Sequence, residues 1–184
     1  MSLKEYREKR KFDQTPEPSG RLRHAGNRDR IFVVQKHDAT SLHYDFRIRV
    51  NGVLASWAVP KGPSMNPADK RLAMRTEDHP FEYADFEGVI PEGHYGAGTI
   101  MVWDKGTYDL SDGLPAEKQL RRGEMKIVLH GKRLRGSFVL VQSQDKRWLL
   151  IKYRDKYSDT SSTMHASDRS ALTGRTLKQI AKSG

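Results

Sequence analysis

The chain has 184 residues and no cysteine, and its 33 Lys and Arg residues outnumber its 23 Asp and Glu residues, for a formal net charge of +10. This composition excludes disulfides and thiolate metal sites, so any metal must be held by His, Asp or Glu. No apolar run approaches the ~18 residues that cross a bilayer, and the charged N-terminus lacks the apolar core of a signal peptide.

The balance of residue types indicates the class of protein. Hydrophobic residues make up 36% of the chain and charged residues 30%, which predicts one domain with a thin core and polar N- and C-terminal extensions. The surplus of positive charge favours nucleic acid as a partner over an anionic membrane surface. We therefore expect a monomer in the cytoplasm that is associated with the nucleoid and not with a membrane.

Residues 1–29 are polar and are interrupted by Pro16, Pro18 and Gly20. A short helix is predicted at residues 4–11, and the prolines that follow cannot continue it. We expect residues 1–29 to form an N-terminal arm that packs on the domain.

Residues 30–157 carry the signals of short strands joined by Gly- and Pro-rich turns, with few helices. Asn51 and Gly52 have the signature of a two-residue hairpin turn. The pattern predicts a mainly β domain, either a compact antiparallel barrel or a sandwich. Residues 158–184 are predicted to form a C-terminal linker and tail with a short helix at 176–182. The predicted strands are 31–35, 43–50, 53–59, 71–76, 99–103, 106–110, 126–129, 136–142 and 148–153, with one helical turn at 117–122.

The segment from Lys36 to Arg47 concentrates two imidazoles, a carboxylate and a guanidinium. From His43 onward the side chains alternate with the period of a strand, so His43, Asp45 and Arg47 share one face and the apolar residues share the other. His37 precedes this strand across a short polar stretch that can fold back. Two imidazoles and one carboxylate can hold a divalent metal and leave positions open, as catalysis requires. The planar fork of Arg47 suits two phosphate oxygens.

A second polar cluster lies downstream. Its His79 and Tyr83 can offer a proton donor and a hydroxyl to a bound anion, although a histidine before a proline is also typical of a simple turn. Lys61 lies in a rigid turn between prolines. The Gly-rich stretch at residues 91–98 lacks the strand-and-helix setting of a nucleotide-binding fingerprint, and we expect its His94 and Tyr95 to be packed rather than reactive.

Several longer segments resemble segments of one known protein family. They are Gln35-Lys36-His37, Leu42-His43-Tyr44-Asp45-Phe46-Arg47, Trp57-Ala58-Val59-Pro60-Lys61-Gly62-Pro63, Glu77-Asp78-His79-Pro80 with Tyr83, Glu87-Gly88-Val89-Ile90-Pro91-Glu92-Gly93-His94-Tyr95-Gly96-Ala97-Gly98, and Trp148-Leu149-Leu150-Ile151-Lys152. The segments follow one another in the same order as in the 3′-phosphoesterase domain of bacterial DNA ligase D, which the chain resembles along residues 10–155. The extent of the resemblance makes it more specific than any one motif.

The resemblance implies a small β-barrel that uses Mn²⁺, or another divalent transition metal such as Zn²⁺ or Co²⁺, to heal 3′ ends. A phosphodiesterase step would remove a terminal ribonucleoside and leave a 3′-phosphate, which a phosphomonoesterase step would then remove. The resemblance implies that the metal ligands are His37, His43 and Asp45. It implies that the residues that act on the scissile phosphate are Arg47, His79 and Tyr83. Further contacts to the phosphate or the substrate are implied for Gln35, Lys61, Arg71, Glu17 and Arg10.

The N-terminal arm departs from the family pattern. The family has Arg-Asp-Phe before Thr-x-Glu-Pro, whereas this chain has Arg10-Lys11-Phe12 before Thr15-Pro16-Glu17-Pro18. Lys11 thus replaces an acidic residue, and if the arm grips the terminal ribose, the phosphodiesterase step is the one most affected. Glu17 carries over from the family more directly than Arg10.

The resemblance also implies partners. They are nucleic-acid 3′ ends on primer-templates that carry a 3′-ribonucleotide or a 3′-phosphate, together with ligase and polymerase repair modules. The sequence itself has no ligase or polymerase motif, and we expect either a free-standing member of the family or an excised domain.

Two other classes of protein fit the same strand. Non-haem iron oxygenases also use two histidines and one carboxylate, but they commonly place the second histidine much later in the chain, and the surplus of Arg and Lys favours phosphate chemistry. A non-catalytic nucleic-acid-binding barrel is the other alternative. Metal-dependent turnover of a 3′-phosphate substrate would distinguish the phosphoesterase from both.

Overall fold

The computed structural model describes residues 1–20, 30–161 and 169–184 of the chain. Residues 21–29 of the predicted arm and 162–168 of the predicted tail lie outside these ranges. The described elements are α1 (Lys4–Glu8), β1 (Ile31–Asp38), β2 (His43–Val50), β3 (Val53–Val59), β4 (Lys70–Arg75), β5 (His79–Pro80), the 3₁₀ helix η1 (Phe81–Asp85), β6 (Gly88–Ile90), β7 (Gly98–Leu110), α2 (Ala116–Arg122), β8 (Glu124–His130), β9 (Arg135–Gln144), β10 (Arg147–Lys152) and α3 (Leu177–Ala181).

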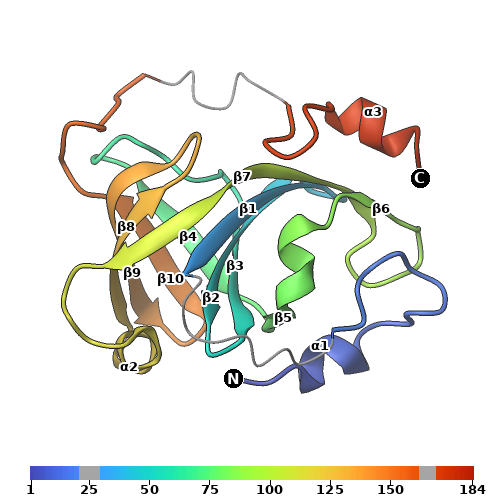
Figure 1. Ribbon diagram of the computed structural model, residues 1–184, viewed down its shortest axis with the longest axis horizontal. Helices are drawn as coiled ribbons and strands as arrows, with labels where there is room; N and C mark the ends of the chain where they lie inside the picture. The colour runs from blue at the N-terminus through green and yellow to red at the C-terminus, as the bar shows by residue number, and fades with distance from the viewer. Residues whose placement is uncertain (21–29, 162–168) are drawn as a thin grey trace.

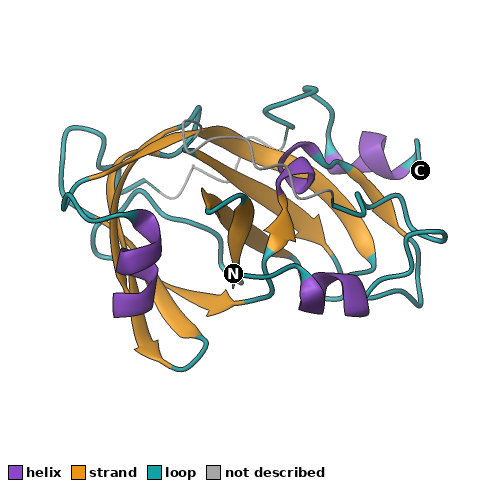
Figure 2. Ribbon diagram, turned by 60° about the horizontal axis from the view of Figure 1, so that its bottom comes forward, coloured by secondary structure: helices purple, strands orange, loops and turns teal. Residues whose placement is uncertain are grey.

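Eight antiparallel strands close into a barrel, as Figure 1 shows. Their order is β1-β2-β3-β4-β10-β9-β8-β7, and β7 pairs back with β1 to complete the ring. Strand β6 extends the sheet beside β7, and β5 pairs with β3 outside the ring. The short helices lie at the periphery (Figure 2). The predicted mainly β, antiparallel barrel is therefore confirmed, and the sandwich is excluded.

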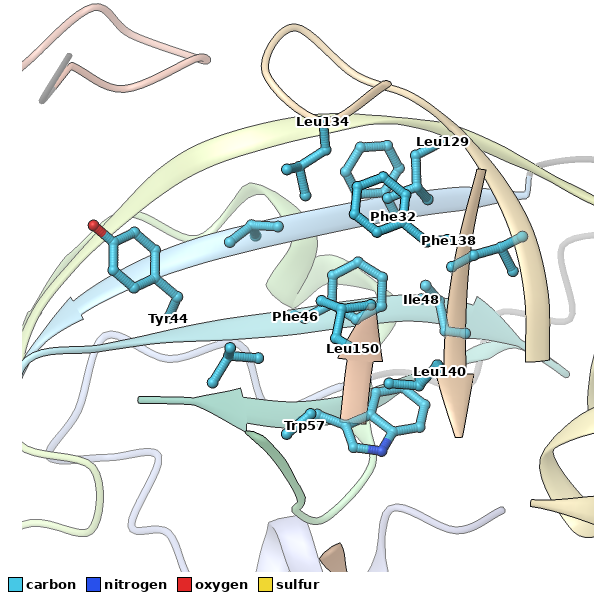
Figure 3. Packing of buried hydrophobic residues seen from close by; sticks show 14 of the residues in the cluster. Phe32, Tyr44, Phe46, Ile48, Trp57, Leu129, Leu134, Phe138, Leu140 and Leu150 are labelled. Atoms are coloured by element: carbon cyan, nitrogen blue, oxygen red, sulfur yellow. The ribbon is translucent and has the colours of Figure 1, made fainter. Parts of the chain in front are cut away.

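The barrel interior holds the larger apolar cluster of the described residues. Phe32, Phe46, Trp57 and Phe138 are fully buried there and pack together with leucines from β9 and β10 (Figure 3). Burying side chains of this size contributes about 1.5–3 kcal/mol each. These residues alternate along their strands with residues that point outward, so the core fixes which side chains reach the outer face.

The outer face of β1, β2 and β3 is also buried, and it carries the candidate site. Its second apolar cluster includes Tyr6 from α1, Val33 from β1, Leu54 from β3 and Tyr83 from η1. Figure 1 shows α1 and the green η1 on the side of these strands away from β8 and β9. The polar residues of β2 therefore do not face open solvent: Asp45 and Arg47 are both buried.

Three local features bear on the sequence predictions. The predicted turn at Asn51 and Gly52 is confirmed, because both residues have the positive φ angles of a two-residue hairpin turn. The two strands predicted at 99–103 and 106–110 are one continuous strand, β7, in which the pairing with β1 shifts register at Val34 and Gln35. A bulge thus bends β7 where the sequence suggested a break.

Of the two interpretations of His79, the simple turn is not what the structure has. His79 and Pro80 form the short strand β5, with His79 paired to Leu54 of β3.

No helix in the described part of the chain combines the length and the apolar character needed to cross a membrane.

Candidate active site

The hairpin of β1 and β2 brings the predicted metal ligands together. The register pairs His37 directly with His43, and Gln35 with Asp45. The two imidazole rings lie with their centroids 4.7 Å apart. Because Asp45 follows His43 by two residues on the same strand, its carboxylate projects from the same face as both rings. The polar stretch between the strands does fold back, as the sequence suggested.

The three side chains have the geometry of a metal-binding group. The His37 Nδ1 atom lies 3.7 Å from Asp45 Oδ2, and His43 Nε2 lies 3.6 Å from Asp45 Oδ1. One ligand atom from each residue falls within 4.8 Å of the other two. Ligand bonds of about 2.1 Å to one ion place neighbouring ligand atoms roughly 3–3.5 Å apart, so small adjustments of the side chains would complete the coordination.

One further observation fits a cation here. His43 Nδ1 lies 2.9 Å from the Ser41 carbonyl oxygen. A proton on Nδ1 would be donated to that carbonyl, which leaves Nε2 free to bind a metal.

The charge of Asp45 is preserved despite its burial. Burial by itself raises the pKa of this carboxyl, but the Arg47 guanidinium and the His37 and His43 rings outweigh it and hold the pKa below its ordinary value. Asp45 is therefore ionised at neutral pH, which is the form that binds a metal.

Arg47 connects this group to the rest of the site. Its guanidinium donates to Gln35 Oε1 at 2.8 Å and to Asp45 Oδ2 at 3.1 Å, and a third nitrogen lies 3.0 Å from His79 Nδ1. Gln35 is fixed in turn, because its amide donates to the carbonyl oxygens of Tyr83 and Phe86. The guanidinium is thus held in one orientation before any ligand arrives.

His79 lies between two guanidinium groups. Arg10 Nη2 lies 3.2 Å from its Nε2, and its Nδ1 lies 2.9 Å from the Glu77 carbonyl oxygen. With the proton on Nδ1, His79 donates to Glu77 and accepts from Arg10 through Nε2. The Arg47 nitrogen then lies beside Nδ1 as a neighbouring charge and does not donate to it. Burial, followed by the charges of Arg47 and Arg10, lowers the pKa of His79 well below its ordinary value. The imidazole is therefore neutral at pH 7.

The low pKa of His79 predicts a loss of stability in acid. The unfolded chain takes up a proton at this histidine near pH 6.5, whereas the folded chain does not, so the stabilisation is complete above about pH 6.5 and is lost as the pH falls below it. Between about pH 7.5 and 5.0 the free energy of unfolding of the metal-free wild type should fall by up to about 2 kcal/mol more than that of a His79→Asn variant. Urea unfolding in EDTA measures both, and equal losses would contradict the assignment.

The N-terminal segment supplies one wall of the site. Arg10 pairs with Glu17 Oε1 at 2.8 Å and with Glu77 Oε1 at 3.0 Å, and all three side chains are almost completely buried. Tyr83 donates its hydroxyl to the same Glu17 oxygen at 3.0 Å. Burial and then the charge of Glu17 raise the pKa of Tyr83 well above its ordinary value. Lys11 is exposed, so the arm reaches the site through Arg10 and Glu17.

These groups surround one cavity of about 320 Å³. Gln35 and Glu17 lie behind its lining and contact it through Arg47, Arg10 and Tyr83. The lining itself includes seven of the predicted site residues, from the N-terminal segment, β1, β2, β5 and η1: Arg10, His37, His43, Asp45, Arg47, His79 and Tyr83.

The structure does not bring every predicted residue to the cavity. Lys61 is exposed, and Arg71 pairs with Asp69 at 3.2 Å; neither lines the cavity. Conversely, the lining includes residues that were not predicted from the sequence, among them Glu77 and Tyr95. Glu77 neighbours His79 in a motif and could have been chosen on that signal, whereas Tyr95 was expected to be packed and is 47% exposed.

The sequence matches a known family and several curated proteins. A family model described as the DNA Ligase D 3'-phosphoesterase domain matches residues 35–142. The "Multifunctional non-homologous end joining protein LigD" of Pseudomonas aeruginosa is 46% identical over 183 residues, which cover 95% of this chain and 22% of that protein. The "Multifunctional non-homologous end joining DNA repair protein LigD" of Mycobacterium tuberculosis is 42% identical over 154 residues, which cover 84% of this chain and 20% of that protein.

The chain therefore spans about a fifth of the length of the curated relatives it matches. The family match includes the last four residues of β1, all of β2 and η1, and the loop before β7, which carry most of the cavity lining. On the sequence match and the barrel together, the chain belongs to the family of DNA ligase D 3′-phosphoesterase domains.

Proposed function

We propose that this chain is a metal-dependent phosphoesterase that heals nucleic-acid 3′ ends. Its phosphodiesterase step removes a terminal ribonucleoside by cleaving the bond from phosphorus to the nucleoside 5′ oxygen, and its phosphomonoesterase step then releases the 3′-phosphate. The observation that carries the proposal is a three-ligand group that shares one cavity with two buried arginines, in a chain of this family.

The metal ligands in this proposal are His37, His43 and Asp45. Their nitrogen and oxygen donors suit Mn²⁺, and also Zn²⁺ or Co²⁺. When bound, such an ion supplies Lewis-acid polarisation of a phosphate oxygen and an acidified water. The three ligands come from one hairpin whose strands are packed on both faces, so the site needs no large rearrangement to form.

The two arginines bind the scissile phosphate. Arg47 is already oriented by Gln35, and its fork is aimed between Asp45 and His79. Because both guanidinium groups are desolvated, an arriving phosphate gains strong charge-assisted hydrogen bonds. Lys61 and Arg71, outside the cavity, contact the substrate strand that flanks the phosphate.

His79 is the general acid for the departing oxygen, and Tyr83 orients the phosphate. Burial, together with the charges of the two arginines, lowers the pKa of His79 and keeps it neutral in the free protein. A bound phosphate offsets their positive charge, which favours protonation of the imidazole at the point where a proton donor is needed. Tyr83 keeps its proton at every physiological pH because its pKa is raised, so its hydroxyl can donate to a phosphate oxygen. Glu17 holds this hydroxyl and Arg10 in the free protein.

The partners of the proposed enzyme are primer-templates that end in a 3′-ribonucleotide or a 3′-phosphate. The relatives' names assign those proteins to non-homologous end joining. We propose that this chain acts in the same process, together with ligase and polymerase modules. We propose further that the domain acts as a monomer, in the cytoplasm near the nucleoid.

One assay tests the reaction class. A labelled primer-template that ends in one ribonucleotide, incubated with the protein and Mn²⁺, should lose the nucleoside and then the phosphate, and EDTA should stop both steps. Products are sized by gel electrophoresis. If neither product forms, while oxygen is consumed with Fe²⁺ and a keto acid, the oxygenase alternative is favoured; binding without turnover would favour the non-catalytic barrel.

Binding of the substrate should weaken steeply with salt. The net charge of +10 implies contacts to several phosphates, and each neutralised phosphate contributes a slope of about −0.9 to a plot of log K against log salt concentration. Fluorescence anisotropy of a labelled duplex with a catalytically inactive Asp45→Asn variant, between about 50 and 200 mM KCl, should give a slope of about −3 or steeper. A slope near zero would contradict an electrostatic mode of binding.

A further inference from the structure

An exposed aromatic ring lines the cavity. Tyr95 belongs to the loop between β6 and β7 and is the one exposed large apolar side chain, among the described residues, that also lines the cavity. Two successive turns hold the loop, with hydrogen bonds from His94 N to Pro91 O and from Ala97 N to His94 O. Gly96, with a φ of 79°, provides the left-handed backbone that the second turn requires.

The position of Tyr95 relative to the phosphate-binding groups follows from a chain of contacts. Arg47 connects the metal-ligand group to His79, and Arg10 lies on the other side of His79. The Arg10 guanidinium carbon lies 5.2 Å from the centre of the Tyr95 ring, and Lys9 Nζ lies 4.8 Å from it. Tyr95 thus lies next to Arg10, one of the two arginines that bind the phosphate, in a loop that leads directly into Gly98 beside Asp38 and Ala39.

The Tyr95 side chain remains accessible to a ligand. Its hydroxyl makes only long contacts, 3.4 Å to Glu77 Oε2 and 3.4 Å to Lys9 Nζ, and nearly half of the side chain is open to solvent although two cations lie over the ring. Ile90 and Gly96 line the cavity beside it. This part of the cavity therefore combines an exposed ring with both charged and apolar neighbours.

The cavity has room for more than a phosphate. Its volume of about 320 Å³ is at the lower end of the range of pockets that hold whole small molecules, about 300–1,000 Å³. A nucleoside attached to the phosphate presents a base with one free π-face, because it is the last base of the strand. Aromatic side chains bind such faces in proteins that hold single-stranded ends, without regard to base identity.

We propose that Tyr95 stacks on the base of the terminal ribonucleoside in the phosphodiester substrate, and so determines how well the enzyme selects a 3′-nucleoside over a bare 3′-phosphate. This inference rests on the proposed function and adds a base-binding subsite to it. A 3′-phosphate substrate has no nucleoside beyond its phosphate and does not use this subsite. The subsite accepts all four bases.

The test compares three primer-templates that differ only at the 3′ end: one ribonucleotide, one ribose without its base, and one phosphate. For Tyr95→Ala, the ratio of kcat/KM for nucleoside removal to kcat/KM for phosphate removal should fall roughly 10- to 100-fold. Tyr95→Phe, which keeps the ring and loses the hydroxyl, should keep the wild-type ratio. Wild type and Tyr95→Ala should remove the baseless ribose at equal rates, because neither can stack on it.

A matched control is Tyr153→Ala, which removes another exposed tyrosine that does not line the cavity and should keep the wild-type ratio. An unchanged ratio in Tyr95→Ala would overturn the inference, as would an equal loss on all three substrates, which would indicate a contact with the primer strand. A loss in Tyr95→Phe as large as in Tyr95→Ala would overturn it too, because the hydroxyl and not the ring would then matter. A wild-type protein inactive on every substrate would overturn the proposed function itself, whereas these other outcomes leave it standing.

Discussion

Asp45→Asn should abolish both ester activities while the barrel stays folded. The substitution keeps the shape of the side chain but removes the charge that two imidazoles and Arg47 share, and so removes the anionic ligand for a divalent metal. Metal ions contribute several kcal/mol to such reactions, so the rate of phosphate release should fall by at least about 1,000-fold. Steady-state release of phosphate from a 3′-phosphate primer measures the loss.

The control for this variant is Asp109→Asn. Asp109 is an exposed carboxylate 2.9 Å from His130, and it does not line the cavity, so it reproduces a histidine–carboxylate pair without the site. Its activity should equal that of the wild type. Circular dichroism and urea midpoints distinguish a lost ligand from a lost fold. His43→Ala should behave like Asp45→Asn, and wild-type rates in both would refute the metal assignment.

Arg47→Lys should lower activity about 100-fold without loss of metal binding. Lysine keeps the positive charge but lacks the planar fork that bridges Gln35, Asp45 and His79. A charge-assisted contact made in the transition state is worth about 3 kcal/mol, or roughly two orders of magnitude in rate. We expect the decrease mainly in kcat, because the fork is aimed at charge that develops during the reaction.

The measurement for this variant has two parts. Kinetics on the 3′-phosphate primer report the transition-state contact, and titration with Mn²⁺ reports the ligand group, which Arg47→Lys leaves intact. Retained Mn²⁺ affinity with a reaction slower by about 100-fold supports separate roles for the two parts of the site. A lysine variant as fast as the wild type would show that charge alone is sufficient there.

Local patterns were enough to predict the centre of this site. Strict alternation from His43 onward placed the imidazole, the carboxylate and Arg47 on one face, and the structure confirms that strand residue for residue. The short polar stretch before it predicted that His37 could fold back, and the register pairs it with His43. Periodicity of two and a short connection are properties of neighbouring residues, so a sequence carries them directly.

The surroundings of the site depend on contacts that the sequence does not display. Arg10 pairs with Glu77, which lies 67 positions later in the chain, and Tyr83 donates to Glu17 across a similar separation. These contacts exist because α1 and η1 both cover the outer face of β1, β2 and β3, which depends on the closure of the whole barrel. For the same reason the sequence did not show that this polar face is buried.

The exposure of Tyr95 and the position of Lys61 illustrate the same limit. An aromatic residue in a Gly-rich loop is expected to be packed on composition alone, but two consecutive turns hold this one at the mouth of the cavity. Lys61 was grouped with the phosphate contacts through the family resemblance, and its place outside the cavity follows from the path of the β3–β4 connection.

The central claim is that His37, His43 and Asp45 hold one cation next to the phosphate-binding arginines. Anomalous diffraction from a crystal soaked in Mn²⁺ tests it most directly. We predict a single strong peak within bonding distance of one atom from each of these side chains, on the side that faces the cavity. Density that shows the three groups turned apart, with no manganese between them in a crystal of active protein, would contradict it.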